Sequence, residues 1–108
     1  MIHKILEGAG LVLNKTYRET RFLKPPTVSY AVYHDSRSIS GADNLNLLTK
    51  HDITIEIYEY TPDLELEKAI ERQLNSSGIE YEKQSRYWIQ EAQLYQIIYE
   101  FTYYEKGA

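Results

Sequence analysis

The residues of this sequence best suited to catalysis are three histidines, His3, His34 and His51. Two of them directly precede an aspartate, and three serines follow the first such pair between positions 36 and 40. A Ser–His–Asp site depends on geometry that neighbours in sequence do not provide, and the sequence has no GxSxG turn. The histidines lack HxH or HxxxH spacing and no cysteine can join them, so a metal site has no support. We expect all three at the surface or at strand ends.

Acid–base pairs and a phosphate-binding loop are the remaining catalytic possibilities. Close carboxylates occur at Glu56 and Glu59 and at Glu65 and Glu67, but each is expected on a solvated face where neither carboxylate is desolvated relative to the other. The GAG at 8–10 lacks the later Gly, Lys and Ser or Thr of a phosphate loop. We therefore predict no catalytic, cofactor-binding or metal-binding residue, and a protein that is not an enzyme.

The charges are unevenly distributed along the chain. The net charge is −4 and the isoelectric point about 5.3, which argues against a protein that coats nucleic acid. Acids cluster between 52 and 71, whereas Lys15, Arg18, Arg21 and Lys24 share ten residues with a single acid, Glu19. We interpret this basic segment as solvated and as a candidate protein interface, without specific nucleic-acid binding.

Length and composition indicate one soluble domain, residues 1–108. A chain of 108 residues matches the commonest domain size, and 43% hydrophobic with 26% charged residues is ordinary for a globular protein. The apolar runs are too short to cross a membrane, and we expect no secretory signal. The absence of cysteine fits a reducing cytosol.

Hydrophobic spacing indicates a helix within 2–13 and a strand over 27–33, joined by a basic, proline-containing connection. The segment 34–46 is rich in Ser, Asp, Asn and Gly, which predicts a long loop. Long loops in compact domains are often functional. The candidate interface residues in this loop are Ser38, Ser40, Gly41, Asp43 and Asn44.

The second half of the chain predicts a strand over 47–60, a helix from the TPD at 61–63 to Gly78, and a hairpin formed by 79–89 and 93–104. Ile53, Ile55 and Ile57 alternate with polar residues, so their face should be core. The expected fold class is α+β. It consists of an antiparallel-dominated sheet of about four strands with two helices on one face, in the order α-β-β-α-β-β.

Tyrosine is the largest departure from average composition, with eleven residues beside two Phe and one Trp. Most of these tyrosines lie in segments with strand patterning. They are either half-buried sheet residues or markers of sheet surfaces that become buried against partners.

Several segments, in order along the chain, resemble the small tail completion, or tail terminator, proteins of long-tailed phages and prophages. The resemblance covers roughly residues 27 to 101. It rests on VSYAVY (28–33), SGADN (40–44), ITIEIY (53–58), LELEK (64–68) with IE (70–71), SGIEY (77–81), WI (88–89) with Glu91, and LYQIIYEF (94–101). The N-terminal third departs from the family pattern.

The resemblance implies a structural virion protein that caps the completed tail tube and joins tail to head. Such a subunit would form a ring, expected to be a hexamer on assembly, and would meet the tail tube protein and the head connector protein. It would assemble in the bacterial host cytoplasm and remain in the virion at the head–tail junction. The alternatives are a head-completion, connector or other minor tail protein, or a small ligand- or protein-binding domain from outside the phages.

Overall fold

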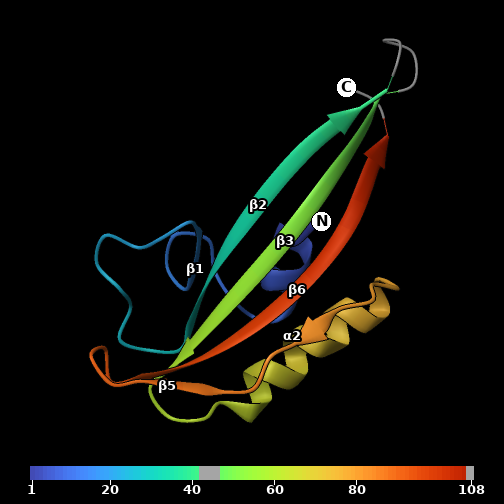
Figure 1. Cartoon of the computed structure of the whole chain (residues 1–108). Coiled ribbons are helices and arrows are strands. Elements are labelled where there is room, and N and C mark those ends of the chain that lie inside the picture. The colour runs from blue at the N-terminus through green and yellow to red at the C-terminus, as the bar shows by residue number, and fades with distance from the viewer. Residues whose placement is uncertain (42–46, 107–108) are drawn as a thin grey trace.

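The computed structural model describes residues 1–41 and 47–106, which form two helices and six strands (Figure 1). The elements are α1 Ile2–Gly8, β1 Tyr17–Glu19, β2 Tyr30–Ser40, β3 Leu48–Glu59, α2 Leu64–Ser76, β4 Glu82–Lys83, β5 Tyr87–Ile89 and β6 Leu94–Lys106. No helix within these residues is long and apolar enough to cross a membrane.

One mixed sheet contains all six strands, in the order β1-β2-β3-β6-β4, with β5 also paired to β6. The long central strands β2, β3 and β6 are antiparallel neighbours, whereas β1 is parallel to β2. The expectation of an antiparallel-dominated sheet of about four strands was therefore wrong. The three strands β1, β4 and β5 have only two or three residues each, too few to show the alternation by which strands are recognised in sequence.

Both helices pack on one face of the sheet. Ile5 and Leu6 of α1 and Ile70 of α2 belong to the same buried cluster as Ile55 and Ile97 of the central strands. The predicted alternation of Ile53, Ile55 and Ile57 is confirmed, since these side chains are at most 2% exposed. A row of β-branched side chains on one sheet face, covered by the apolar stripes of two helices, forms the core.

The helix boundaries differ from those predicted. α1 occupies only the first part of the predicted range 2–13 and ends at Gly8, and Gly10 has a φ of 96° that only glycine adopts without strain. The N-cap of α2 is Asp63, whose side chain accepts a 3.1 Å hydrogen bond from the backbone N–H of Leu66. Thr61 and Pro62, predicted as cap and first helical residue, precede the helix.

β2 is longer than predicted, because residues 34–40 of the expected loop continue the strand. Each of them is paired in register with β3, from His34 opposite Thr54 to Ser40 opposite Leu48. Polar composition indicated a loop, but a strand exposed on both faces can be polar because its backbone hydrogen bonds are made within the sheet.

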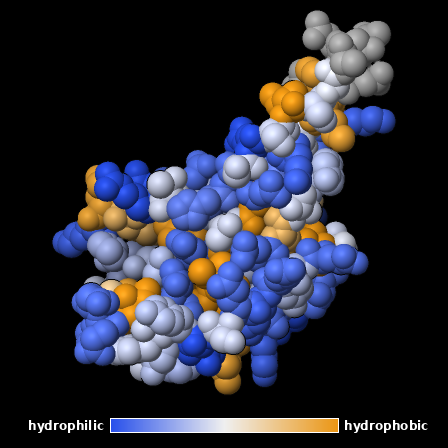
Figure 2. Space-filling model, viewed as in Figure 1, coloured by the Kyte–Doolittle hydropathy of each residue, from blue (hydrophilic) through white to orange (hydrophobic). Residues whose placement is uncertain are grey.

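The three long strands extend beyond the helices as a ribbon (Figure 1). We call this ribbon the projection and define it as residues 36–40 of β2, 48–52 of β3 and 102–106 of β6. It lengthens the molecule, whose principal extents are 49 × 29 × 23 Å. Figure 2 shows apolar residues near its end, with further apolar residues spread over the body. The rest of the molecule is the body.

Candidate interaction surfaces

The four residues of the predicted basic interface lie on the β1 side of the sheet. Lys15 is in the turn before β1, Arg18 is in β1, and Arg21 and Lys24 follow it. All four are exposed, because alternate residues of a three-residue edge strand and its flanking turns face solvent. The structure thus brings them to one side of the molecule, and their role as an interface remains a prediction.

The five residues of the predicted loop interface are divided by the structure. Ser38 and Ser40 are exposed residues of β2, and the exposed Gly41 follows the strand. Asp43 and Asn44 lie outside the described residues. The serines at 36, 38 and 40 point to one face of the projection while Asp35, Arg37 and Ile39 point to the other. This alternation is the signal that could have indicated a strand.

His51 is buried within β3 at the base of the projection, so its predicted position at the surface or at a strand end was wrong. It is 4% exposed, with Nδ1 2.9 Å from Asp35 and Nε2 3.1 Å from Glu105. Its ring stacks on Tyr103 at 4.4 Å between centroids, and Arg37 donates a 3.1 Å bond to Asp35. The cluster joins β2, β3 and β6 through side chains. The sequence could have indicated the burial of His51, because His51 continues the alternation of Ile53, Ile55 and Ile57.

The other two histidines are less enclosed. His34 lies on the opposite face of β2 and contacts Glu56 at 3.2 Å. His3, on the exposed side of α1, lies 2.7 Å from the hydroxyl of Tyr17, which donates a 2.5 Å bond to Glu7. These contacts dock α1 against β1. The described residues hold no cluster of three or more side chains that could bind a metal ion.

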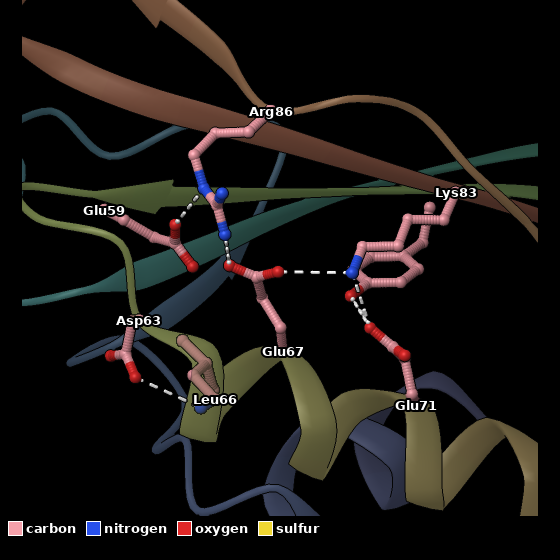
Figure 3. A network of polar contacts seen from close by, with 8 residues as sticks. Glu59, Asp63, Leu66, Glu67, Glu71, Lys83 and Arg86 are labelled. Carbon is pink, nitrogen blue, oxygen red and sulfur yellow. Dashed lines mark hydrogen bonds and ion pairs between the residues drawn. The ribbon is translucent and has the colours of Figure 1, made fainter.

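A second polar cluster joins α2 to the sheet (Figure 3). Glu67 of α2 is 3% exposed and accepts bonds from Arg86 at 2.6 Å and from Lys83 at 3.2 Å. Lys83 also donates to Glu71 at 2.8 Å, and the Tyr99 hydroxyl donates to the same carboxylate at 2.6 Å. The cations come from the segment containing β4, so this cluster fixes that segment to the helix.

Glu59, at the end of β3, is fully buried beside this cluster. Its carboxylate lies 3.5 Å from the Nε of Arg86 and has no hydrogen-bond partner for either oxygen among the described residues. Burial, with the adjacent negative charge of Glu67, raises the pKa of Glu59 to about 7. Burial would also raise the pKa of Glu67, but its hydrogen bonds, including those from Arg86 and Lys83, hold that pKa below its usual range.

The expectation that Glu59 and Glu67 lie on solvated faces was therefore wrong. Two carboxylates with pKa values moved in opposite directions are the pattern of an acid–base pair. Here, however, both oxygens of Glu59 are inaccessible, so no substrate atom can reach them. The geometry supports a structural role, in which the pair positions Arg86. Glu67 lies three and seven residues before Ile70 and Leu74, and this helical spacing could have indicated its burial.

The tyrosines fall into two groups. Tyr17 and Tyr99 are fully buried, and Tyr30 stacks on Tyr58 at 5.1 Å on the sheet face away from the helices. Others remain exposed, among them Tyr87 at 64% and Tyr104 at 60%. The first interpretation of the tyrosine content, burial in the sheet, applies to the enclosed group, whereas burial of the exposed group against partners stays a prediction.

Acidic residues gather on the opposite side of the sheet from the basic segment. An open groove of about 510 Å³ runs along β3, β6 and the segment entering β4. Its acidic lining residues are Asp52, Glu80, Glu82 and Glu100. The two sides of the sheet thus carry opposite charge.

Comparison with known proteins adds a fold likeness. No family model matches the chain, and no curated protein matches it. Among solved structures, a chain of the virion of a native gene transfer agent particle superposes with a TM-score of 0.59 at 13% sequence identity. The match covers 95% of this chain and 84% of that chain, so essentially the whole described fold is similar to that of a component of a virion particle.

Proposed function

We propose that this protein is a structural component of a phage-like virion. The observation that carries the proposal is the fold likeness to a chain of a gene transfer agent virion, which extends over 95% of this chain. A likeness restricted to one common supersecondary unit would carry little weight, whereas this one includes the helices and the sheet. The sequence resemblance to tail completion proteins points to the same class of particle.

Within the virion, we assign the protein to the end of the tail tube, where a ring of subunits caps the tube and joins it to the head. Its partners are then copies of itself, expected as a hexamer, the tail tube protein and the head connector protein. It would assemble in the host cytoplasm and remain at the head–tail junction. The exposed basic segment at Lys15, Arg18, Arg21 and Lys24 and the projection with Ser38 and Ser40 are surfaces suited to such contacts.

We propose a role without catalysis. The buried polar groups His51 and Glu67 are already engaged within the fold, His51 by Asp35 and Glu105 and Glu67 by Arg86 and Lys83, and the carboxylate of Glu59 is sealed from solvent. A group whose hydrogen bonds are satisfied internally has little capacity left for a substrate. This supports a structural use of the buried polar residues.

The test is assembly in the presence of purified tail tube protein. Size-exclusion chromatography with light scattering, at rising concentration, should show ring-sized species, and electron microscopy should show the protein at one end of each tube. Binding to a head connector without binding to tubes would favour the head-completion alternative. A stable monomer that ignores both partners and retains a small ligand would contradict the virion role.

A further inference from the structure

The two outer edges of the projection lack neighbouring strands among the described residues. β1 covers β2 only opposite Ala31, Val32 and Tyr33, so residues 34–40 have β3 on one side alone. β5 and β4 cover β6 only as far as Glu100, which leaves the outer side of residues 101–106 unpaired. Each edge therefore presents backbone N–H and C=O groups that can accept a further strand.

Apolar side chains accompany these edges. Ile39 on β2 is 70% exposed and Tyr104 on β6 is 60% exposed. Proteins commonly protect long edge strands with prolines, bulges, charged side chains or covering loops, because exposed edges pair with other chains. The exposed charges of these two edges are Arg37, Glu105 and Lys106. Residues 34–40 and 101–106 contain no proline, and Figure 1 shows both strands extended away from the helices. The side chains of an added strand would lie beside Ile39 and Tyr104 and reduce their exposed apolar area.

Charge distinguishes the two sides of the sheet. The β2 side exposes Arg37 together with Lys15, Arg18, Arg21 and Lys24 of the basic segment, with Glu19 as an interruption. The β6 side exposes Glu80, Glu82, Glu100 and Glu105; its exposed cations are Lys83 and Arg86, which are ion-paired with Glu67 and Glu71, and Lys106 at the tip. Like sides of two copies would repel each other and unlike sides would attract. The complementary occupant of each edge is therefore the opposite edge of a second copy.

The strand directions define the pairing. β2 and β6 are both antiparallel to β3 and so run in the same direction. We propose that residues 34–40 of one copy pair in parallel with residues 101–106 of a second copy, so that the sheet continues from subunit to subunit. Each copy uses both edges, and such a head-to-tail contact closes into a ring when its rotation permits. The inference rests on the proposed ring function and specifies the contact that builds the ring.

The absence of cysteine allows a direct test. Ser38→Cys is combined in turn with Thr102→Cys, Tyr104→Cys or Lys106→Cys, which together sample the offset between the paired edges. Within one copy β3 separates these positions by two strand spacings, about 10 Å, whereas a disulfide needs Cα atoms within about 7 Å. Any disulfide therefore joins two copies.

We expect one double variant to give a covalent series of oligomers up to ring size after oxidation, alone or with tail tube protein. The single variants should not, and neither should Ser38→Cys combined with Ser76→Cys, which places the second cysteine at the exposed end of α2. Ring-sized particles without any cross-linked edge pair would overturn this inference and leave the proposed function standing. Efficient cross-linking by Ser38→Cys alone would also overturn it, because it indicates a symmetric β2–β2 contact.

A second measurement uses Ser38→Lys, which adds a charge of the kind that protects edge strands. The concentration for half-assembly should rise at least tenfold while the melting temperature of the subunit stays unchanged, and Ser76→Lys should alter neither. Unchanged assembly of Ser38→Lys would contradict the edge contact. A protein that remains monomeric in all these experiments would contradict both the contact and the proposed function.

Discussion

The body and the projection share the same three strands and differ in what stabilises them. In the body, one face of β3 buries Ile53, Ile55 and Ile57 under two helices, and each such side chain contributes roughly 1.5–3 kcal/mol. In the projection, the same strand has polar residues on both faces and its backbone pairing continues unchanged. Apart from the His51 cluster at its base and a 2.6 Å hydrogen bond that Thr102 donates to Asp52, the projection is stabilised by its hydrogen-bonded ladder. The sheet therefore extends further than folding of the core requires.

The largest difference in stability between the body and the projection should appear when a charged residue is introduced into each of them. Ile55→Asp or Ile97→Asp puts an unpaired carboxylate on a fully buried face, at a cost of several kcal/mol against a total stability of about 5–15 kcal/mol. We expect both variants to be unfolded by circular dichroism, whereas Ser38→Asp in the projection should be folded. A folded, soluble Ile55→Asp would mean that the core does not depend on this face.

A smaller, pH-dependent effect is expected at Glu59. Its folded pKa of about 7 lies above its unfolded value, so the folded state holds a proton that the unfolded chain has lost at pH 5–6. Its contribution to stability is therefore complete below pH 4.5 and disappears as the pH rises through about 7. Glu59→Gln should be more stable than the original protein at pH 8, by on the order of 2–3 kcal/mol, and similar to it near pH 4.5.

Urea unfolding from pH 4.5 to 8 measures this difference. Glu65→Gln, at an exposed position of α2, is the matched control and should leave the profile unchanged. The free energy of unfolding of Glu59→Gln could instead fall between pH 4.5 and 8 as steeply as that of the original protein. In that case Glu59 is not the group responsible for the pH dependence.

At the boundary between the two regions, His51 and His34 can be compared directly. His51→Gln removes a buried ring that contacts two carboxylates, and should cost about 1–2 kcal/mol. His34→Gln alters a half-buried contact with a single carboxylate and should cost less than about 0.5 kcal/mol. Amide exchange should show faster opening at 36–40 and 102–106 in the His51 variant alone. Equal losses of stability and equal amide exchange in both variants would contradict the prediction that the His51 cluster stabilises the projection.

The smallest effects on stability are expected within the projection. Ile39→Ser and Tyr104→Ser change exposed residues that pack on no buried cluster, so each should alter the free energy of unfolding by less than about 0.5 kcal/mol. Thermal unfolding of the subunit tests this. Tyr99→Ser, on the same strand but fully buried, is the contrasting control and should lower the melting temperature clearly.

Elements with strong periodicity could be predicted from sequence. The alternation of Ile53, Ile55 and Ile57 predicted the core face of β3, and the stripe of Ile70 and Leu74 predicted α2. The parallel pairing of β1 could not be predicted, because a strand of three residues carries too little pattern to be recognised. For β2, polar composition concealed a strand whose stability comes from backbone bonds.

The burial of two polar residues could not be predicted from the hydrophobic pattern, for a different reason. Glu67 and His51 occupy positions of the apolar stripes but are hydrophilic, and a hydrophobic pattern treats such residues as solvent-facing. Their burial depends on partners from other elements: Arg86 and Lys83 for Glu67, and Asp35 for His51. Such partners can be identified only when the fold is known.

The position of β6 in the chain has a consequence during synthesis on the ribosome. β2 and β3 are consecutive and can form a hairpin early, and both helices that cover the face with Ile55 precede β6 in the chain, but the other edge of β3 remains unpaired until β6 has been made. A long apolar strand with an open edge can pair with other nascent chains. The central strand, best protected in the finished molecule, is therefore the segment most in need of a chaperone while the chain is incomplete.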